Sequence, residues 1–127
     1  MREAVRRLSQ LRDMKQEVDE LSQRIARLEG QRVRAPGPAV RGETALADVR
    51  GRMEARRLDC MEELGRLYAF IDDIPESRLR RIFAFRYIDG LTWQQIAFRI
   101  GEYDEQCPRK MHNKYLSMNQ INMESLS

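Results

Sequence analysis

Apolar residues recur every three or four positions through the first quarter of the chain. They fall at Leu11, Met14, Val18, Leu21, Ile25 and Leu28, and polar or charged residues fill most positions between them. Alternating steps of three and four are the a/d spacing of a coiled-coil helix, which places these side chains on one face. The pattern therefore predicts a long amphipathic helix over about residues 2–29, which stops at Gly30.

A second apolar stripe follows a stretch rich in turn formers. Residues 30–44 hold two prolines and three glycines, which predict a loop, and Thr44 is a suitable cap for the next helix. The stripe of that helix, about residues 45–74, comprises Leu46, Val49, Met53, Cys60, Leu64, Leu67, Ile71 and Ile74. Two such helices can pack on each other as a hairpin or pair with those of a second chain. The pattern leaves both arrangements open.

Shorter helices are predicted after residue 74. The first runs from Pro75 to about Tyr87, and its apolar face comprises Leu79, Ile82, Phe83 and Tyr87. Gly90 permits a turn, and Thr92 caps a helix whose inner face holds Ile96, Ala97 and Ile100. Residues 1–74 then form a helical arm, and residues 75–127 a separate part that ends in a polar tail.

The last predicted helix gives the C-terminal part its candidate chemistry. Gly101 follows the Thr92 helix where a helix-turn-helix needs a tight corner, and Asp104 can cap the next helix near Pro108. Met111, Tyr115 and Leu116 are expected to point inward, whereas Arg109, Lys110, Asn113 and Lys114 are expected to point outward. We therefore predict an all-α fold: a long helical hairpin or coiled-coil arm followed by a C-terminal helix-turn-helix bundle.

Composition supports long solvated helices but leaves the partner open. Charged residues make up 34% of the chain against 42% hydrophobic ones, and the net charge is only +3. Residues 75–127 carry eight basic and six acidic side chains, which is a weak balance for a protein that binds nucleic acid. Arg, Lys and Asn on one helix face suit phosphates and base edges. A solvated helix face explains the same residues equally well.

The phrase "RRIFAFRYIDGLTWQQIAFRIG", followed by "RKMHNKYL", carries a resemblance. It resembles the C-terminal DNA-binding region (region 4) of bacterial sigma-70-class factors. The whole chain is similar to small phage and prophage proteins of Gram-positive bacteria that end in such a helix-turn-helix. The resemblance implies that Thr92, Trp93 and Gln94 begin a supporting helix that contacts the DNA backbone. It also implies that the recognition helix contacts DNA through Glu105, Gln106, Arg109 and Lys110, to which the outward Asn113 and Lys114 are added.

Other candidate residues have simpler explanations. His112 has no ligand-type neighbours at metal-site spacing, so we expect it to be exposed, with a phosphate or groove contact as the alternative. The residues themselves favour packing for Trp93 over base stacking. Cys60 and Cys107 are expected to be free thiols in a reducing cytoplasm, with Cys60 buried as a small apolar residue. We find no catalytic constellation, so we predict no enzyme activity, no cofactor and no metal.

Together these observations predict a sequence-specific, double-stranded-DNA-binding transcriptional regulator of phage type in the bacterial cytoplasm. RNA polymerase is a second expected partner, and a homodimer or higher oligomer is expected through the helical arm. No apolar run approaches the length of a membrane span, so no membrane association is expected. Two alternatives stay open: a DNA-packaging oligomer similar to small terminase subunits, and a helical adaptor that binds a protein such as polymerase without reading DNA.

Overall fold

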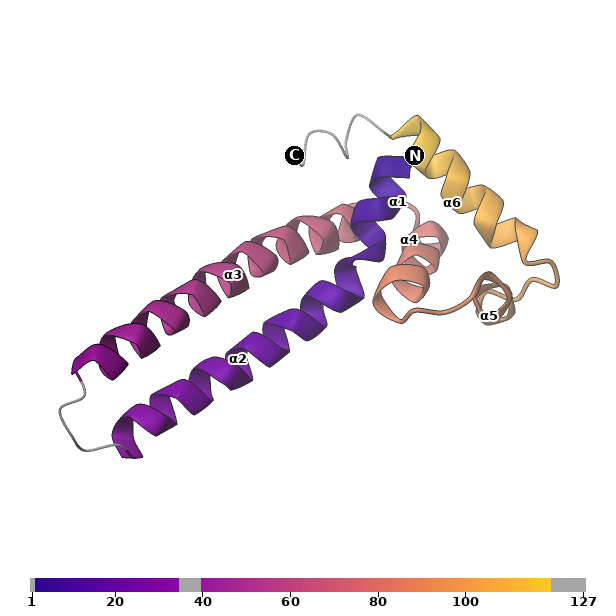
Figure 1. The fold of residues 1–127 in the computed structure, drawn as a ribbon. Helices are drawn as coiled ribbons and strands as arrows, with labels where there is room; N and C mark the ends of the chain where they lie inside the picture. The colour runs from indigo at the N-terminus through magenta and orange to yellow at the C-terminus, as the bar shows by residue number, and fades with distance from the viewer. Residues whose placement is uncertain (1, 35–39, 120–127) are drawn as a thin grey trace. The chain divides into compact units, whose positions relative to one another are not determined.

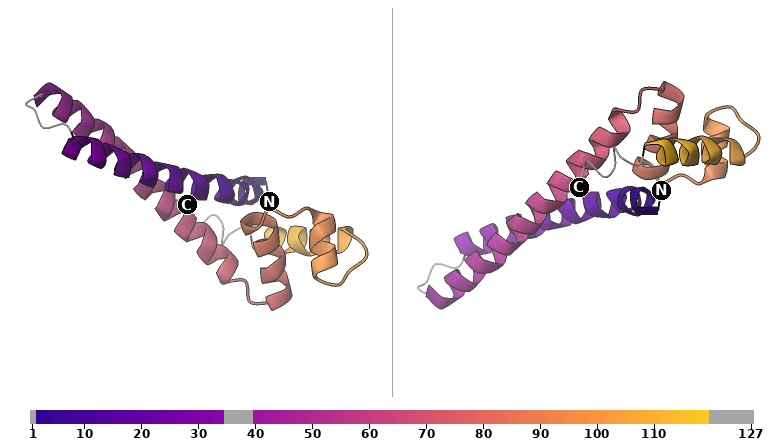
Figure 2. Two further views of the ribbon diagram at one scale, coloured as in Figure 1. Left: turned by 90° about the horizontal axis from the view of Figure 1, so that it is seen from below. Right: turned by 90° about the horizontal axis from the view of Figure 1, so that it is seen from above.

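The computed structural model of the chain describes residues 2–34 and 40–119, and all the regular elements in these residues are helices (Figure 1). They are α1 (Arg2–Ser9), α2 (Leu11–Arg34), α3 (Val40–Asp72), α4 (Ser77–Phe83), the π-helical turn η1 (Ala84–Ile88), α5 (Trp93–Arg99) and α6 (Gln106–Met118). Helices α2 and α3 run side by side and pack as a hairpin (Figures 1 and 2). The predicted all-α class and the hairpin are confirmed.

The first predicted helix differs from the observed one at two places. A turn at Gln10 separates α1 from α2, because the Gln10 N–H donates to the carbonyl oxygen of Arg7 at 3.2 Å, one residue nearer than an α-helix requires. The predicted stop at Gly30 is wrong, since α2 continues to Arg34. A glycine inside a helix costs only about 1 kcal/mol, which the flanking helical residues offset.

The second predicted helix begins earlier than expected. Because α3 starts at Val40, Thr44 lies inside the helix, and its predicted role as a cap is wrong. Gly42 is likewise helical. The other turn formers of the predicted loop, residues 36–38, lie outside the described residues.

Close backbone contacts group the chain into two units. We name residues 13–64 the hairpin unit, and residues 1–12 together with 65–127 the bundle unit. Helix α1 is therefore grouped with the C-terminal helices, although it is far from them in sequence. The predicted division into residues 1–74 and residues 75–127 stays a prediction.

The hairpin unit has a narrow core. Its buried apolar side chains are Leu21, Ile25, Cys60 and Leu64, all of which belong to the two predicted stripes. Val49 is 42% exposed, and the other residues of the stripes in this unit are half-buried: Met14, Val18, Leu28, Leu46 and Met53. Across the hairpin, the Cys60 thiol donates to Glu17 Oε1 at 3.4 Å, and burial raises the pKa of that thiol, with the Glu17 hydrogen bond adding to the effect. Cys60 is thus a buried free thiol, as predicted.

The bundle unit has a wider core that draws on every helix in it. Its most buried apolar side chains are Leu8, Leu11, Leu67, Ile74, Ile82, Phe83, Ile96 and Leu116, none of which is more than 1% exposed. The predicted inner face of α4 and its continuation is confirmed, since Leu79, Ile82, Phe83 and Tyr87 are all buried. On α5, Ile96 and Ala97 are buried as predicted, whereas Ile100 is only half-buried. The core supports the two helices and the turn that form the candidate site.

Candidate nucleic-acid interface

The start of α5 is fixed by reciprocal hydrogen bonds. The backbone N–H of Gln95 donates to Thr92 Oγ1 at 3.2 Å, and the backbone N–H of Thr92 donates to Gln95 Oε1 at 2.9 Å. This is a capping box, which satisfies two N–H groups that a helix start otherwise leaves open. The predicted cap at Thr92 is confirmed. Thr92 lies two residues after Gly90, whose φ is +71°.

Gly101 makes the corner between α5 and α6. Its φ is +81°, and its N–H donates to the carbonyl oxygen of Phe98 at 3.2 Å. The N–H of Glu102 donates to the carbonyl oxygen of Ala97 at 2.8 Å. These two bonds form a Schellman motif, whose left-handed residue favours glycine. The sequence-based expectation of a tight corner at Gly101 is confirmed.

The turn after Gly101 is tied at both ends. Glu102 forms an ion pair with Arg78 from the first turn of α4. Asp104 Oδ1 accepts a hydrogen bond of 2.9 Å from the N–H of Gln106, the first residue of α6, although Glu105 and not Asp104 occupies the N-cap position. Pro108 lies in the first turn of α6 and is buried, which suits a residue without a backbone N–H. The entry of the chain into α6 is therefore well defined.

The inner face of α6 includes His112, which we expected to be exposed. This side chain is only 2% exposed, so the prediction that it is exposed, or contacts phosphate, is wrong. Its Nε2 lies 2.6 Å from the hydroxyl of Tyr87, and its ring stacks on Phe83 with centroids 4.8 Å apart. The ring of Trp93 packs edge-on against the imidazole, with the two ring centroids 4.9 Å apart. His112 is therefore part of an aromatic core cluster.

Burial sets the charge state of this cluster. Desolvation lowers the pKa of His112, and the hydrogen bond to Asn113 opposes that shift only in part. Burial also raises the pKa of Tyr87 to about 12. At neutral pH both side chains are uncharged, so the hydrogen bond between Tyr87 and His112 joins two neutral groups.

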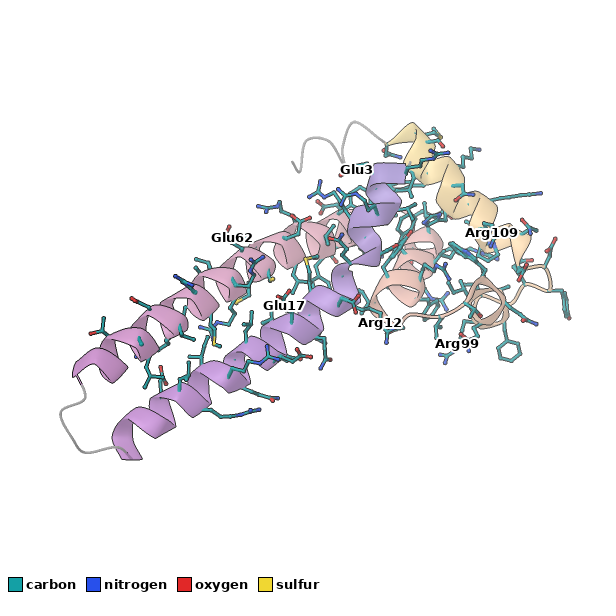
Figure 3. All side chains as sticks on the ribbon, in the orientation of Figure 1. Glu3, Arg12, Glu17, Glu62, Arg99 and Arg109 are labelled. Atoms are coloured by element: carbon teal, nitrogen blue, oxygen red, sulfur yellow. The ribbon has the colours of Figure 1, made fainter. Side chains whose placement is uncertain are left out.

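The outer face of α6 gathers most of the predicted contact residues. Arg109, Lys110 and Lys114 are exposed, and Gln106 and Asn113 are half-buried. Their positions, three and four residues apart, place them along one side of the helix, opposite the buried side chains. Arg109 can be followed on α6 in Figure 3. Three cations and two amides thus share a solvent-facing surface, which we name the α6 outer face.

The remaining predicted contact residues lie around this face. Thr92 and Gln94 are exposed at the start of α5, and Glu105 is exposed at the start of α6. Trp93 is only 9% exposed, so the interpretation of Trp93 as a packing residue is confirmed. The guanidinium of Arg86 lies over its ring, 4.6 Å from the centroid. Arg86 also donates to the carbonyl oxygen of Leu91 at 3.1 Å, which secures the turn before α5.

Sequence reasoning missed a groove beside α5. Its volume is about 560 Å³, and it is lined by Leu91, Gln94, Gln95, Phe98, Arg99, Glu102 and Tyr103. The Phe98 side chain is 83% exposed, and that of Tyr103 is fully exposed. The sequence did hold a signal for Phe98, because it lies two residues from Ile96 and therefore on the opposite side of the helix. Large aromatic side chains at such positions often mark an interaction surface.

Two other kinds of site find no support in the described residues. Within residues 2–34 and 40–119, no His, Cys, Asp and Glu side chains form a group of three or more that could hold a metal ion. Over the same residues, no helix combines the length and apolar character needed to cross a membrane. Comparisons with protein-family models, curated proteins and solved structures find no match to the chain.

Proposed function

We propose that the protein binds double-stranded DNA sequence-specifically through the α6 outer face and acts as a transcriptional regulator of phage type. The observation that carries this proposal is the side-chain chemistry of that face. Arg109, Lys110 and Lys114 supply cations for phosphates, and Gln106 and Asn113 supply amides for base edges. The face lies on a helix whose opposite side is buried, so it projects from a supported surface.

The link to transcription rests on the resemblance to sigma region 4. The capped start of α5, the left-handed Gly101 and the supported α6 are the features that a helix-turn-helix uses to place a recognition helix in a major groove. Double-stranded DNA is therefore the proposed partner, and RNA polymerase a second one. The hairpin unit is proposed to pair the chain as a homodimer or higher oligomer, since operators for such proteins commonly hold two half-sites.

The test is binding to labelled duplexes selected from a random library, followed by fluorescence anisotropy. Arg109→Ala with Lys110→Ala should weaken binding to the selected duplex by about tenfold or more, because it removes two of the three cations proposed to neutralise phosphates. The matched control is Lys15→Ala with Arg27→Ala, which removes two exposed cations from α2. Equal losses in both variants would show that general charge, rather than the α6 outer face, binds the DNA.

A second candidate function is favoured by the groove beside α5. Phe98 and Tyr103 expose aromatic surface next to Leu91, and aromatic side chains are enriched in protein interfaces. A helical adaptor would bind a protein such as RNA polymerase here and would not read DNA. Phe98→Ala with Tyr103→Ala should then abolish capture of purified polymerase, whereas Arg109→Ala with Lys110→Ala should not affect it. The reverse pattern would reject the adaptor.

A further inference from the structure

A chain of hydrogen bonds leads from the core of the bundle unit to the α6 outer face. The Tyr87 hydroxyl lies 2.6 Å from His112 Nε2, and His112 Nδ1 lies 2.9 Å from Asn113 Oδ1. Tyr87 and His112 are 5% and 2% exposed, whereas Asn113 is half-buried on the helix surface. The relay thus joins two buried side chains to one that faces outward.

The chemistry of the three groups fixes the direction of each bond. A carbonyl oxygen such as Asn113 Oδ1 can only accept, so His112 must carry a proton on Nδ1 and donate it. A neutral imidazole has a single N–H, so Nε2 is then the acceptor, and the Tyr87 hydroxyl donates to it. Every bond therefore points the same way, from Tyr87 through His112 to Asn113.

Packing holds the imidazole in this orientation. Its ring stacks on Phe83 with an interplanar angle of 28°. The ring of Trp93 packs edge-on against it with an interplanar angle of 67°. Turning the ring over would move both nitrogens away from Tyr87 and Asn113, and each buried polar group that loses its partner costs about 1–3 kcal/mol. Asn113 Oδ1 therefore faces a fixed donor, which leaves the two N–H groups of its Nδ2 on the other arm of the amide.

We propose that Tyr87 and His112 orient Asn113 as a hydrogen-bond donor, so that Asn113 selects guanine over adenine at the base pair that it faces. This inference rests on the proposed DNA binding and deepens it. Guanine presents two acceptors, N7 and O6, in the major groove, whereas adenine presents N7 beside the N6 amino donor. The usual pairing of asparagine with adenine needs Oδ1 as the acceptor for N6, and in this chain His112 engages that atom.

Asn113 is the contact residue in this arrangement, and Tyr87 and His112 are positioning residues. Replacing both positioning residues removes the relay without leaving either buried side chain with an unsatisfied polar group. In Tyr87→Phe with His112→Phe the aromatic rings remain, but Asn113 can turn its amide over and accept from adenine. Asn113→Asp provides a second variant on the helix surface, where folding is less at risk. Its carboxylate can only accept, which suits the amino groups of adenine and cytosine.

The experiment is selection of duplexes from a randomised library by the full chain and each variant, with sequencing of the bound pool. The wild type should prefer guanine over adenine at one position by at least about fivefold, the lower end of what one specific contact gives. In Tyr87→Phe with His112→Phe this preference should fall to within about twofold, while the preferences attributable to the other contacts persist. Asn113→Asp should reverse it towards adenine or cytosine. A loss of folding would instead weaken all positions together.

A spectroscopic readout tests the relay without DNA. The imidazole ¹⁵N shifts of His112 should show a proton on Nδ1 and none on Nε2, and the opposite tautomer would overturn the inference. An adenine preference in the wild type, or an unchanged guanine preference in the double variant or in Asn113→Asp, would also overturn it while leaving DNA binding in place. If the wild type selects no duplex at all, the proposed function fails and the inference fails with it.

Discussion

The two units of the chain are built from similar amphipathic helices, yet they bury side chains to different depths. The bundle unit buries Phe83, Ile82 and Ile96 completely, whereas the best-buried apolar side chain of the hairpin unit, Ile25, is still 6% exposed. Two helices in a hairpin cover each stripe from one side only. Helices that cross in a bundle cover it from several sides, so the bundle can fix side chains that a hairpin leaves adjustable.

This difference bears on where the proposed recognition surface lies. A recognition surface must be held to within a fraction of an ångström, and the α6 outer face lies opposite the best-packed part of the molecule. Besides its narrow core, the hairpin unit carries two exposed apolar side chains, Leu58 and Met61. Its architecture suits a role in association, which tolerates adjustment, more than a role in reading base edges.

The sharpest contrast between the units is expected from removing one large side chain in each. Phe83→Ala deletes a ring that contacts Phe70, Tyr87, His112 and Tyr115, and it should lower the free energy of unfolding by about 3–5 kcal/mol. Leu58→Ala, at a side chain 56% exposed, should change it by less than about 0.5 kcal/mol. Urea denaturation measures both. Similar losses at the two positions would contradict the account of a deep and a shallow core.

Glycine substitutions should have opposite signs in the two units. Gly101→Ala adds a Cβ at a φ of +81°, where space is open but the backbone is strained, and it should cost about 1–2 kcal/mol. Gly51→Ala lies inside α3 with open space around the added atom, and it should stabilise the protein by about 0.5–1 kcal/mol. Thermal unfolding followed by circular dichroism compares them. A stabilising Gly101→Ala would show that the corner does not depend on its left-handed residue.

Acid should weaken the bundle unit through His112. Because burial lowers the pKa of His112 in the folded state, the unfolded chain binds a proton more readily. The contribution of this residue to stability is therefore complete above its unfolded pKa of about 6.5 and is lost as the pH falls from there through the folded pKa. His112→Phe should show a flatter dependence between pH 6.5 and 5 in urea titrations. Identical pH profiles for both proteins would contradict the assigned neutral, buried state.

The smallest expected effect is at the ion pair that ties the turn. Arg78 and Glu102 are about 40% exposed, so water and salt screen their attraction. A double-mutant cycle of Arg78→Ala and Glu102→Ala should give a coupling free energy of about 0.2–1 kcal/mol. A coupling well above that range would mean that the turn before α6 depends on this pair more than on its backbone hydrogen bonds.

Local features were predictable from the sequence because they depend on near neighbours. The apolar stripes, the cap at Thr92 and the corner at Gly101 each follow from residues within one or two helical turns, and the structure confirms them. The grouping of α1 with the C-terminal helices depends on contacts between segments far apart in the sequence. The helical periodicity of a sequence does not indicate such contacts.

His112 shows how residue type can mislead. It is the sole histidine and has no ligand-type neighbours at metal-site spacing, so it was expected to be exposed. Its spacing of four residues from both Pro108 and Leu116 nevertheless placed it on the inner face, and Tyr87 supplies the hydrogen bond that makes burial tolerable. Spacing was the better guide than polarity here, but the partner that satisfies the imidazole lies 25 residues away in the sequence.

The central claim is that cations of the α6 outer face neutralise DNA phosphates. The most direct measurement is the dependence of duplex affinity on salt concentration, for the wild type and for Arg109→Ala with Lys110→Ala. Three phosphate contacts predict a slope of log K against log salt of about −2.7, and removal of two should make it shallower by about 1.8. A slope near zero in the wild type, or one that the double substitution leaves unchanged, would contradict the claim.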